Sequence, residues 1–130
     1  MTDALFVYGS LRAGAKHPMY EVLCEHGKPA GLARVRGRLY TVDWYPGLVL
    51  DPRADWVVGE LWTDIESAAW PVLDFYEGCS AEDPQPHEYI RRETTVEHGD
   101  AVLRAWVYDY ARDVGTLERI RSGDWLRPHA

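Results

Sequence analysis

A glutamate at the end of an expected helix is the first residue whose type and position suit chemistry. In Leu73-Asp74-Phe75-Tyr76-Glu77-Gly78, the glycine is typical of the residue just past a helix, so Glu77 falls in the last turn. The helix dipole disfavours a carboxylate there by roughly 0.3–1 kcal/mol and raises its pKa. Such a carboxyl group suits general acid–base catalysis at neutral pH. The alternative, a solvated glutamate tolerated at small cost, stays open on position alone.

A junction between a strand and a loop is the second candidate. Ala4–Tyr8 is a short run of strand-forming residues, and Gly9-Ser10-Leu11-Arg12 follows it. A glycine where a strand ends lets the backbone turn sharply and gathers successive N–H groups, which suits an anion. The same residues also fit a simple strand stop.

Three further polar residues lie on expected strands. Glu60 lies mid-strand between two apolar residues of one face, so it is either a rival acid or the ion-pair partner of an arginine. Tyr89 and Arg91 share a face of another strand and offer a hydroxyl donor and a fixed positive charge, or only cross-strand packing. Whether Glu60, Arg12 or Arg91 contributes to a site is left open.

Cysteines and histidines form no comparable pattern. Cys24 and Cys79 lie in no nucleophile elbow, and the five histidines lack the spacing of metal ligands. The sequence also lacks a Gly-x-Gly-x-x-Gly motif and a phosphate-loop lysine. We therefore predict no thiol nucleophile, no metal and no cofactor.

The elements that must hold these residues are mostly strands, with two main helices. Gly27 is expected to cap the first helix in the left-handed conformation, and Pro71 must lie in the first turn of the second. The order of elements predicts an α+β fold with a mixed or mainly antiparallel sheet, which can close into a small barrel. Strands are expected over 4–8, 30–40, 48–50, 56–63, 89–97 and 101–110, and helices over 18–26, 66–76 and 116–121.

Composition and charge narrow the class of protein. The chain has 130 residues, an apolar share of 46% and a net charge of −7, which predicts a single domain over 1–130. Its acidity disfavours nucleic acid or an anionic membrane as partner. No run reaches the roughly 18 apolar residues of a membrane helix, and Met1-Thr2-Asp3 does not begin a signal peptide. We expect a cytoplasmic protein with reduced thiols.

Several motifs in one order resemble the γ-glutamylcyclotransferase-like superfamily. Phe6–Arg12 resembles its Tyr-Gly-Ser/Thr-Leu signature, and Leu73–Gly78 resembles its Leu-Asp-x-x-Glu-Gly motif. The likeness is to the short, single-domain bacterial branch, related to the plant avirulence-induced proteins and the γ-glutamylamine cyclotransferases. The other matching segments are Leu39-Tyr40 with Tyr45–Leu48, Val58–Trp62, Tyr89–Arg91, Ala105–Tyr108 and Ile120–Trp125.

The resemblance implies a small mixed, mainly antiparallel β-barrel flanked by helices, with a cavity at its mouth. It implies that Tyr8, Gly9, Ser10 and Leu11 line the substrate pocket, that Glu77 is the acid/base, and that Tyr89 lies at the pocket edge. The implied substrate is a γ-glutamyl amine or another small γ-glutamylated metabolite, which cyclises to 5-oxoproline without a cofactor. The chain departs from the family at Ser80–Glu88, which leaves the specificity for the leaving group open.

Two other functions remain possible on the sequence. One is an enzyme that removes a γ-glutamyl protecting group during antibiotic biosynthesis, and the other is a non-catalytic module that binds a small molecule. Glu77 together with the intact loop favours catalysis, because a binding module needs no acid at a helix end. Glutathione is the less expected substrate, since this branch is shorter than the members that degrade it. The sequence predicts no oligomeric state.

Overall fold

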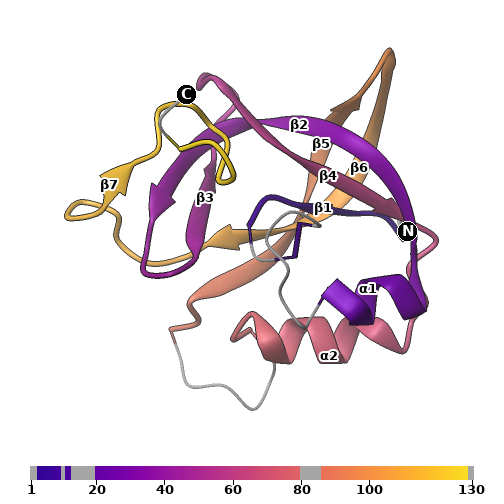
Figure 1. The fold of residues 1–130 in the computed structure, drawn as a ribbon. Helices are drawn as coiled ribbons and strands as arrows, with labels where there is room; N and C mark the ends of the chain where they lie inside the picture. Colours follow the sequence, from indigo (N-terminus) through magenta and orange to yellow (C-terminus); the bar gives the residue numbers. More distant parts are fainter. Residues whose placement is uncertain (1–2, 10, 13–19, 80–85, 129–130) are drawn as a thin grey trace.

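The computed structural model describes residues 3–9, 11–12, 20–79 and 86–128. Their fold is a small barrel with two short helices packed on one side (Figure 1). The strands are β1 (Leu5–Val7), β2 (Lys28–Thr41), β3 (Pro46–Leu50), β4 (Trp56–Thr63), β5 (Tyr89–His98), β6 (Ala101–Tyr110) and β7 (Glu118–Arg119), and the helices are α1 (Tyr20–His26) and α2 (Ala69–Tyr76).

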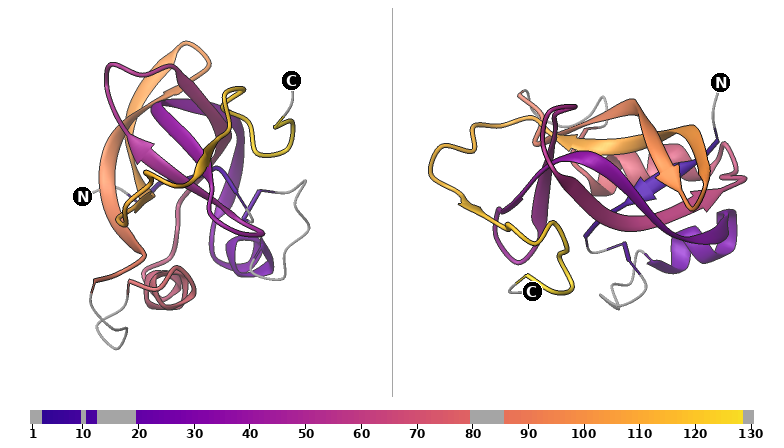
Figure 2. Two further views of the ribbon diagram at one scale, coloured as in Figure 1. Left: turned by 90° about the vertical axis from the view of Figure 1, so that its left-hand side faces the viewer. Right: turned by 90° about the horizontal axis from the view of Figure 1, so that it is seen from above.

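Five of the strands form a closed ring. Their order is β1-β4-β2-β3-β6, and β6 pairs with β1 to close the ring. The pairings β1–β6 and β3–β6 are parallel and the others are antiparallel, so the barrel is mixed but mainly antiparallel. Two extra strands flank it, since β5 forms a hairpin with β6 and β7 pairs with β2 (Figure 2). The predicted fold class is confirmed.

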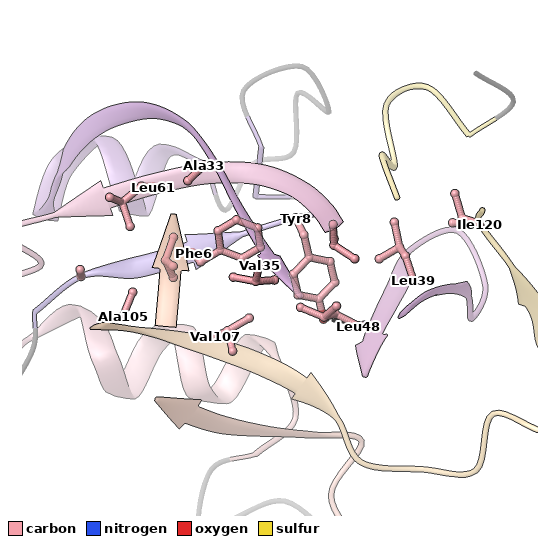
Figure 3. Close-up of a cluster of buried hydrophobic side chains, with 13 residues drawn as sticks. Phe6, Tyr8, Ala33, Val35, Leu39, Leu48, Leu61, Ala105, Val107 and Ile120 are labelled. Carbon is pink, nitrogen blue, oxygen red and sulfur yellow. Dashed lines mark hydrogen bonds between the residues drawn. The ribbon is translucent and has the colours of Figure 1, made fainter. Parts of the chain in front are cut away.

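Strand β1 is buried on both faces, as its continuous apolar run predicts. Phe6 and Tyr8 point into the barrel, where they pack with Val35, Leu48 and Val107 (Figure 3). The alternate residues of β1 face outward toward the helices, because successive side chains of a strand point to opposite faces. This second core joins Leu5 and Val7 to residues of both helices, Leu23, Ala69 and Leu73.

Helix α2 ends in a glycine-dependent turn at the position that the sequence predicts. The N–H of Cys79 donates to the carbonyl of Asp74 at 3.0 Å, and the N–H of Gly78 donates to that of Phe75 at 3.2 Å. Gly78 has a φ of +73°, so a residue with a side chain is strained here. Pro71 lies in the first turn of α2, as expected. Among the described residues no helix is long and apolar enough to cross a membrane.

Two expectations for local structure are wrong. The segment 116–121 is not helical: Glu118 and Arg119 pair with Thr41 and Tyr40 of β2, and this extended path buries Ile120 in the barrel core. Gly27 follows α1, but its φ is not left-handed. A glycine is needed there because a Cβ would lie 2.6 Å from Cδ1 of Ile65. The expected start of α1 at Pro18 lies outside the described residues.

Candidate active site

A cavity of about 240 Å³ opens at one end of the barrel. It is bounded by the end of β1, the turn before β3, the end of α2 and the start of β5. Five of the six residues predicted for the site line it, and the sixth, Ser10, lies outside the described residues. The lining residues are Phe6, Val7, Tyr8, Gly9, Leu11, Trp44, Tyr45, Pro46, Tyr76, Glu77, Glu88, Tyr89 and Tyr108.

Glu77 is the residue at the C-terminal boundary of α2, and its N–H donates to the carbonyl of Leu73. Burial, followed by the negative charges of Glu88 and Asp74, raises the pKa of Glu77 to about 8. The upward direction agrees with the sequence analysis, but the main cause is burial and not the helix dipole. A carboxyl group with this pKa can both accept and donate a proton near neutral pH.

Gly9 packs directly against Pro46 in the cavity wall. The N–H of Arg12 donates to the Gly9 carbonyl at 3.0 Å, which closes a tight turn over residues 9–12. The φ of Gly9 is not in the left-handed region. The expectation that this turn needs the conformational freedom of glycine is therefore wrong. Space is the reason instead, because a Cβ on Gly9 would lie 2.7 Å from Cγ of Pro46.

Gly9→Ala should therefore weaken substrate binding by about tenfold, because one methyl group forced into a packed wall displaces its neighbours. The measurement is the dissociation constant for a γ-glutamyl amide, compared with the melting temperature. Gly115→Ala is the control, since Gly115 is exposed and a Cβ there faces only the flexible side chain of Asp113. A lower melting temperature with unchanged affinity would show that Gly9 is only a structural turn.

Two of the cavity tyrosines, Tyr8 and Tyr89, donate to backbone carbonyls. The Tyr8 hydroxyl donates to the Tyr108 carbonyl at 2.6 Å and accepts from the Leu48 N–H at 3.2 Å. The Tyr89 hydroxyl donates to the Pro46 carbonyl at 2.6 Å. Burial raises the pKa of both phenols, so they stay protonated and fix the shape of the walls.

Arg91 does not line the cavity. Its Nε and Nη2 donate to the two carboxylate oxygens of Asp74 at 2.9 and 3.2 Å. The guanidinium lies over the rings of Trp70 and Trp106, 4.6 and 4.7 Å from their centroids. Tyr108 also donates to Asp74. Arg91 thus ties α2 to the β5–β6 hairpin, and its charge is offset by Asp74.

Glu60 is likewise not a cavity residue, so it is no rival acid for this site. Its carboxylate accepts from Nε of Arg12 at 3.3 Å, while Nη1 of Arg12 donates to Asp124 at 2.7 Å. The pairing with an arginine was the alternative left open by the sequence, although the arginine comes from a loop and not from a strand. Arg12 therefore acts on the site only by anchoring the 9–12 turn.

Two aromatic residues and a second acid were missed as site residues. The Tyr45 hydroxyl donates to the Glu88 carboxylate, and Trp44 packs edge-on against Tyr45 at 5.0 Å. The Glu88 Cβ lies 4.0 Å from the position that a Cβ on Gly78 would take, which puts it beside the helix end that carries Glu77. In the sequence, only the position of Glu88 directly before Tyr89 indicated that it could belong to the site. Tyr45 lies 43 positions away, so no local pattern links it to Glu88.

Thiol and metal chemistry find little support at this cavity. Burial, then the charges of Asp74 and Glu77, raises the pKa of the Cys79 thiol to about 11, so the nucleophilic thiolate is scarce at neutral pH. Cys24 is exposed on α1. Over the described ranges, His, Cys, Asp and Glu side chains form no group of three able to hold a metal ion.

A closed five-stranded barrel with a tight glycine turn and a half-buried glutamate at its mouth defines the class of γ-glutamylcyclotransferase-like folds. Comparison with known proteins agrees. The sequence profile of the family described as "Gamma-glutamyl cyclotransferase, AIG2-like" matches residues 5–127. The chain belongs to this family.

Individual relatives cover nearly the whole chain. The "Gamma-glutamylcyclotransferase family protein YtfP" of Escherichia coli K12 is 34% identical over 125 residues, 94% of this chain and 95% of the relative. The solution structure of E. coli YtfP superposes with a TM-score of 0.67 at 30% identity, covering 95% of this chain and 96% of that one. An AIG2-like protein from Mus musculus has the same fold, with a TM-score of 0.70, 23% identity and coverage of 92% and 86%. Against YkqA of Bacillus subtilis the TM-score is 0.72 at 24% identity, and the match covers 96% of this chain but only 40% of YkqA.

Proposed function

We propose that this protein is a γ-glutamylcyclotransferase that converts a small γ-glutamyl amide into 5-oxoproline and a free amine, with Glu77 as acid and base. The observation that carries the proposal is the position of Glu77, which lines the same cavity as Tyr8 and Gly9 and whose pKa is raised to about 8, mainly by burial. Family membership supports the reaction class.

The substrate supplies its own nucleophile. The α-amine of the γ-glutamyl group attacks the γ-carbonyl carbon, forms a C–N bond in a five-membered ring and expels the amide nitrogen as the leaving amine. Because nucleophile and carbonyl are tethered, much of the advantage of proximity is already present in the substrate. The protein must move protons from the attacking nitrogen to the leaving nitrogen and hold the substrate.

Glu77 acts first as the base and then as the acid. Ionised Glu77 takes a proton from the α-ammonium group, which frees the amine lone pair for attack. Protonated Glu77 then gives that proton to the leaving nitrogen as the C–N bond of the amide breaks, which regenerates the carboxylate. The ring nitrogen loses a second proton as it becomes the neutral lactam; the carboxylate accepts this proton and passes it to the released amine, which leaves as an ammonium ion. We expect backbone N–H groups at the end of β1, next to Gly9, to hold the α-carboxylate or the oxyanion of the tetrahedral intermediate.

A screen of γ-glutamyl compounds for release of 5-oxoproline tests the proposal. We expect stoichiometric 5-oxoproline and free amine from at least one γ-glutamyl amide. Tight binding without turnover across the screen would instead support a non-catalytic binding module, and the proposed reaction would be wrong.

The pH dependence of kcat/KM provides an independent prediction. Since Glu77 must be ionised to accept the proton, kcat/KM should rise about tenfold per pH unit up to its pKa near 8. It should fall again once the α-ammonium group of the free substrate, with a pKa of roughly 8, loses its proton. Glu88→Gln should move the rising limb to lower pH, because the charge of Glu88 helps to raise the pKa of Glu77. A profile that is flat between pH 6 and pH 8 would contradict the assignment.

A further inference from the structure

The cavity contains a second carboxyl group that the cyclisation does not use. One acid/base suffices for the proton transfer, and Glu77 fills that role in the proposed function. Glu88 lines the same cavity and lies beside the helix end that carries Glu77, with its Cβ 4.0 Å from the Cβ position of Gly78. A partly buried carboxylate without a task in the reaction favours a positively charged ligand group.

The carboxylate of Glu88 is held in place by a hydrogen bond from Tyr45. Tyr45 donates its hydroxyl to the carboxylate, and burial followed by this hydrogen bond raises the pKa of the phenol, so Tyr45 remains a donor. The Tyr45 ring packs in turn against the rings of Trp44 and Tyr89, with ring centroids 5.0 and 6.3 Å away. Glu88 is thus a positioned group, and its carboxylate does not move freely in solvent.

The aromatic residues beside Glu88 suit the same kind of ligand. Trp44 lines the cavity and is 60% exposed, which places its ring at the open side together with Tyr45. Tryptophan and tyrosine faces attract ammonium groups, and the attraction is strongest where water is partly excluded. The described lining residues include no lysine or arginine to neutralise Glu88, and Arg112 instead donates to the carbonyl of Pro86.

The leaving amine is expected to extend toward this side of the cavity. The proposed function puts the glutamyl part of the substrate beside Gly9 and Glu77, which leaves the exposed side at Trp44 for the substituent on the amide nitrogen. We propose that Glu88, positioned by Tyr45 and flanked by Trp44, selects γ-glutamyl amides whose leaving amine carries a second, positively charged amino group. This inference rests on the proposed cyclotransferase function and names its leaving-group class.

Three substrates of equal chain length test the inference: the γ-glutamyl amides of 1,4-diaminobutane (cationic), n-butylamine (neutral) and 4-aminobutyrate (anionic). We expect kcat/KM for the cationic amide to exceed that for the neutral one by about tenfold, and the anionic amide to be slower still, because one partly desolvated charge pair is worth at least that factor. Added salt should reduce the preference, since it screens the charge.

Glu88→Gln should lower the ratio of cationic to neutral kcat/KM toward one. Tyr45→Phe, which keeps the ring but removes the hydroxyl, should lower the ratio in part. The control is Glu93→Gln, because Glu93 is an exposed acid of β5, the strand directly after Glu88, and pairs with Arg104 away from the cavity. Both glutamine variants change the net charge equally, and only Glu88→Gln should change the ratio. If Glu88→Gln fails to fold, the wild-type ratio, its salt dependence and Tyr45→Phe decide the question.

Failure of this inference is distinguishable from failure of the proposed function. Turnover of the neutral amide with no preference for the cationic one, within about threefold, would overturn the selection by Glu88 and leave the cyclotransferase in place. An equal loss for all three substrates in Glu88→Gln would also overturn it, because Glu88 would then act on the shared glutamyl part. If none of the three yields 5-oxoproline while another γ-glutamyl amide of the screen does, the leaving-group class is wrong and the cyclotransferase stands; if no compound of the screen does, both proposals are wrong.

Discussion

Replacing Glu77 with glutamine should lower the rate of 5-oxoproline release by on the order of 10²–10⁴. The amide cannot take the proton of the α-ammonium group, whereas its size preserves the cavity wall. The affinity for a γ-glutamyl amide, measured by calorimetry, should stay within about threefold. Activity within tenfold of the parent would refute Glu77 as the acid/base. Since Glu60 lies outside the cavity and is paired with Arg12, attention would then pass to Glu88.

The same substitution should change the dependence of stability on pH. An exposed glutamate has a pKa of about 4.3, and burial raises that of Glu77 in the folded protein to about 8. The folded state therefore binds this proton more tightly than the unfolded state, and the associated stability is complete below about pH 4 and is lost as pH rises to 8. Glu77→Gln cannot ionise, so at pH 9 its urea midpoint should exceed that of the parent, and the difference should be smallest near pH 4. A parent midpoint equal to that of Glu77→Gln at every pH would show that Glu77 ionises without cost.

Arg12→Ala should lower the free energy of unfolding by about 3–5 kcal/mol, because it leaves two carboxylates without their shared cation. The Arg12 side chain is only 5% exposed, and those of Glu60 and Asp124 are each 18% exposed. Urea unfolding at neutral pH, followed by circular dichroism, measures the loss. Activity should fall as well, since the Arg12 side chain holds the residue that follows the Gly9 turn in place through Glu60 and Asp124.

An exposed arginine of the same barrel provides the control for this prediction. Arg38 pairs with Asp51 at 2.8 Å, and their side chains are 38% and 24% exposed. For Arg38→Ala we expect a loss of at most about 1 kcal/mol, as is usual for surface pairs. Equal losses for the two variants would show that the Arg12 pair is no more than a surface salt bridge.

Features that depend on local sequence could be predicted, and those that depend on distant contacts could not. The alternation along β4 puts Val57, Gly59 and Leu61 on one face, and the structure buries all three. Gly78 marked the end of α2, and with it the position of Glu77, because a left-handed turn leaves a glycine in the sequence. The hairpin β5–β6 was equally clear from its two strand-like runs around Gly99.

The errors share a physical cause. Pro46 limits the space at Gly9 and Ile65 limits it at Gly27, and no local pattern reveals a neighbour so far along the chain. The segment 116–121 has weak preferences of its own, and pairing with β2 decides its conformation. Glu88 falls in the segment Ser80–Glu88 where the chain departs from the family, and its partner Tyr45 lies 43 positions away.

Strand β1 has a consequence for the way the protein is made. Its three residues close the barrel by pairing with β4 and with β6, and Tyr8 directly after it binds the carbonyl of Tyr108, 100 positions later. Contacts between residues so distant in sequence form late in folding, because the entropy lost in closing the long loop must first be offset by contacts elsewhere in the fold. On the ribosome, the cavity walls therefore cannot assemble until β6 has emerged. A nascent chain stopped before Trp106 should expose the apolar faces of β1 and be a substrate for chaperones and proteases, with no active intermediate along the way.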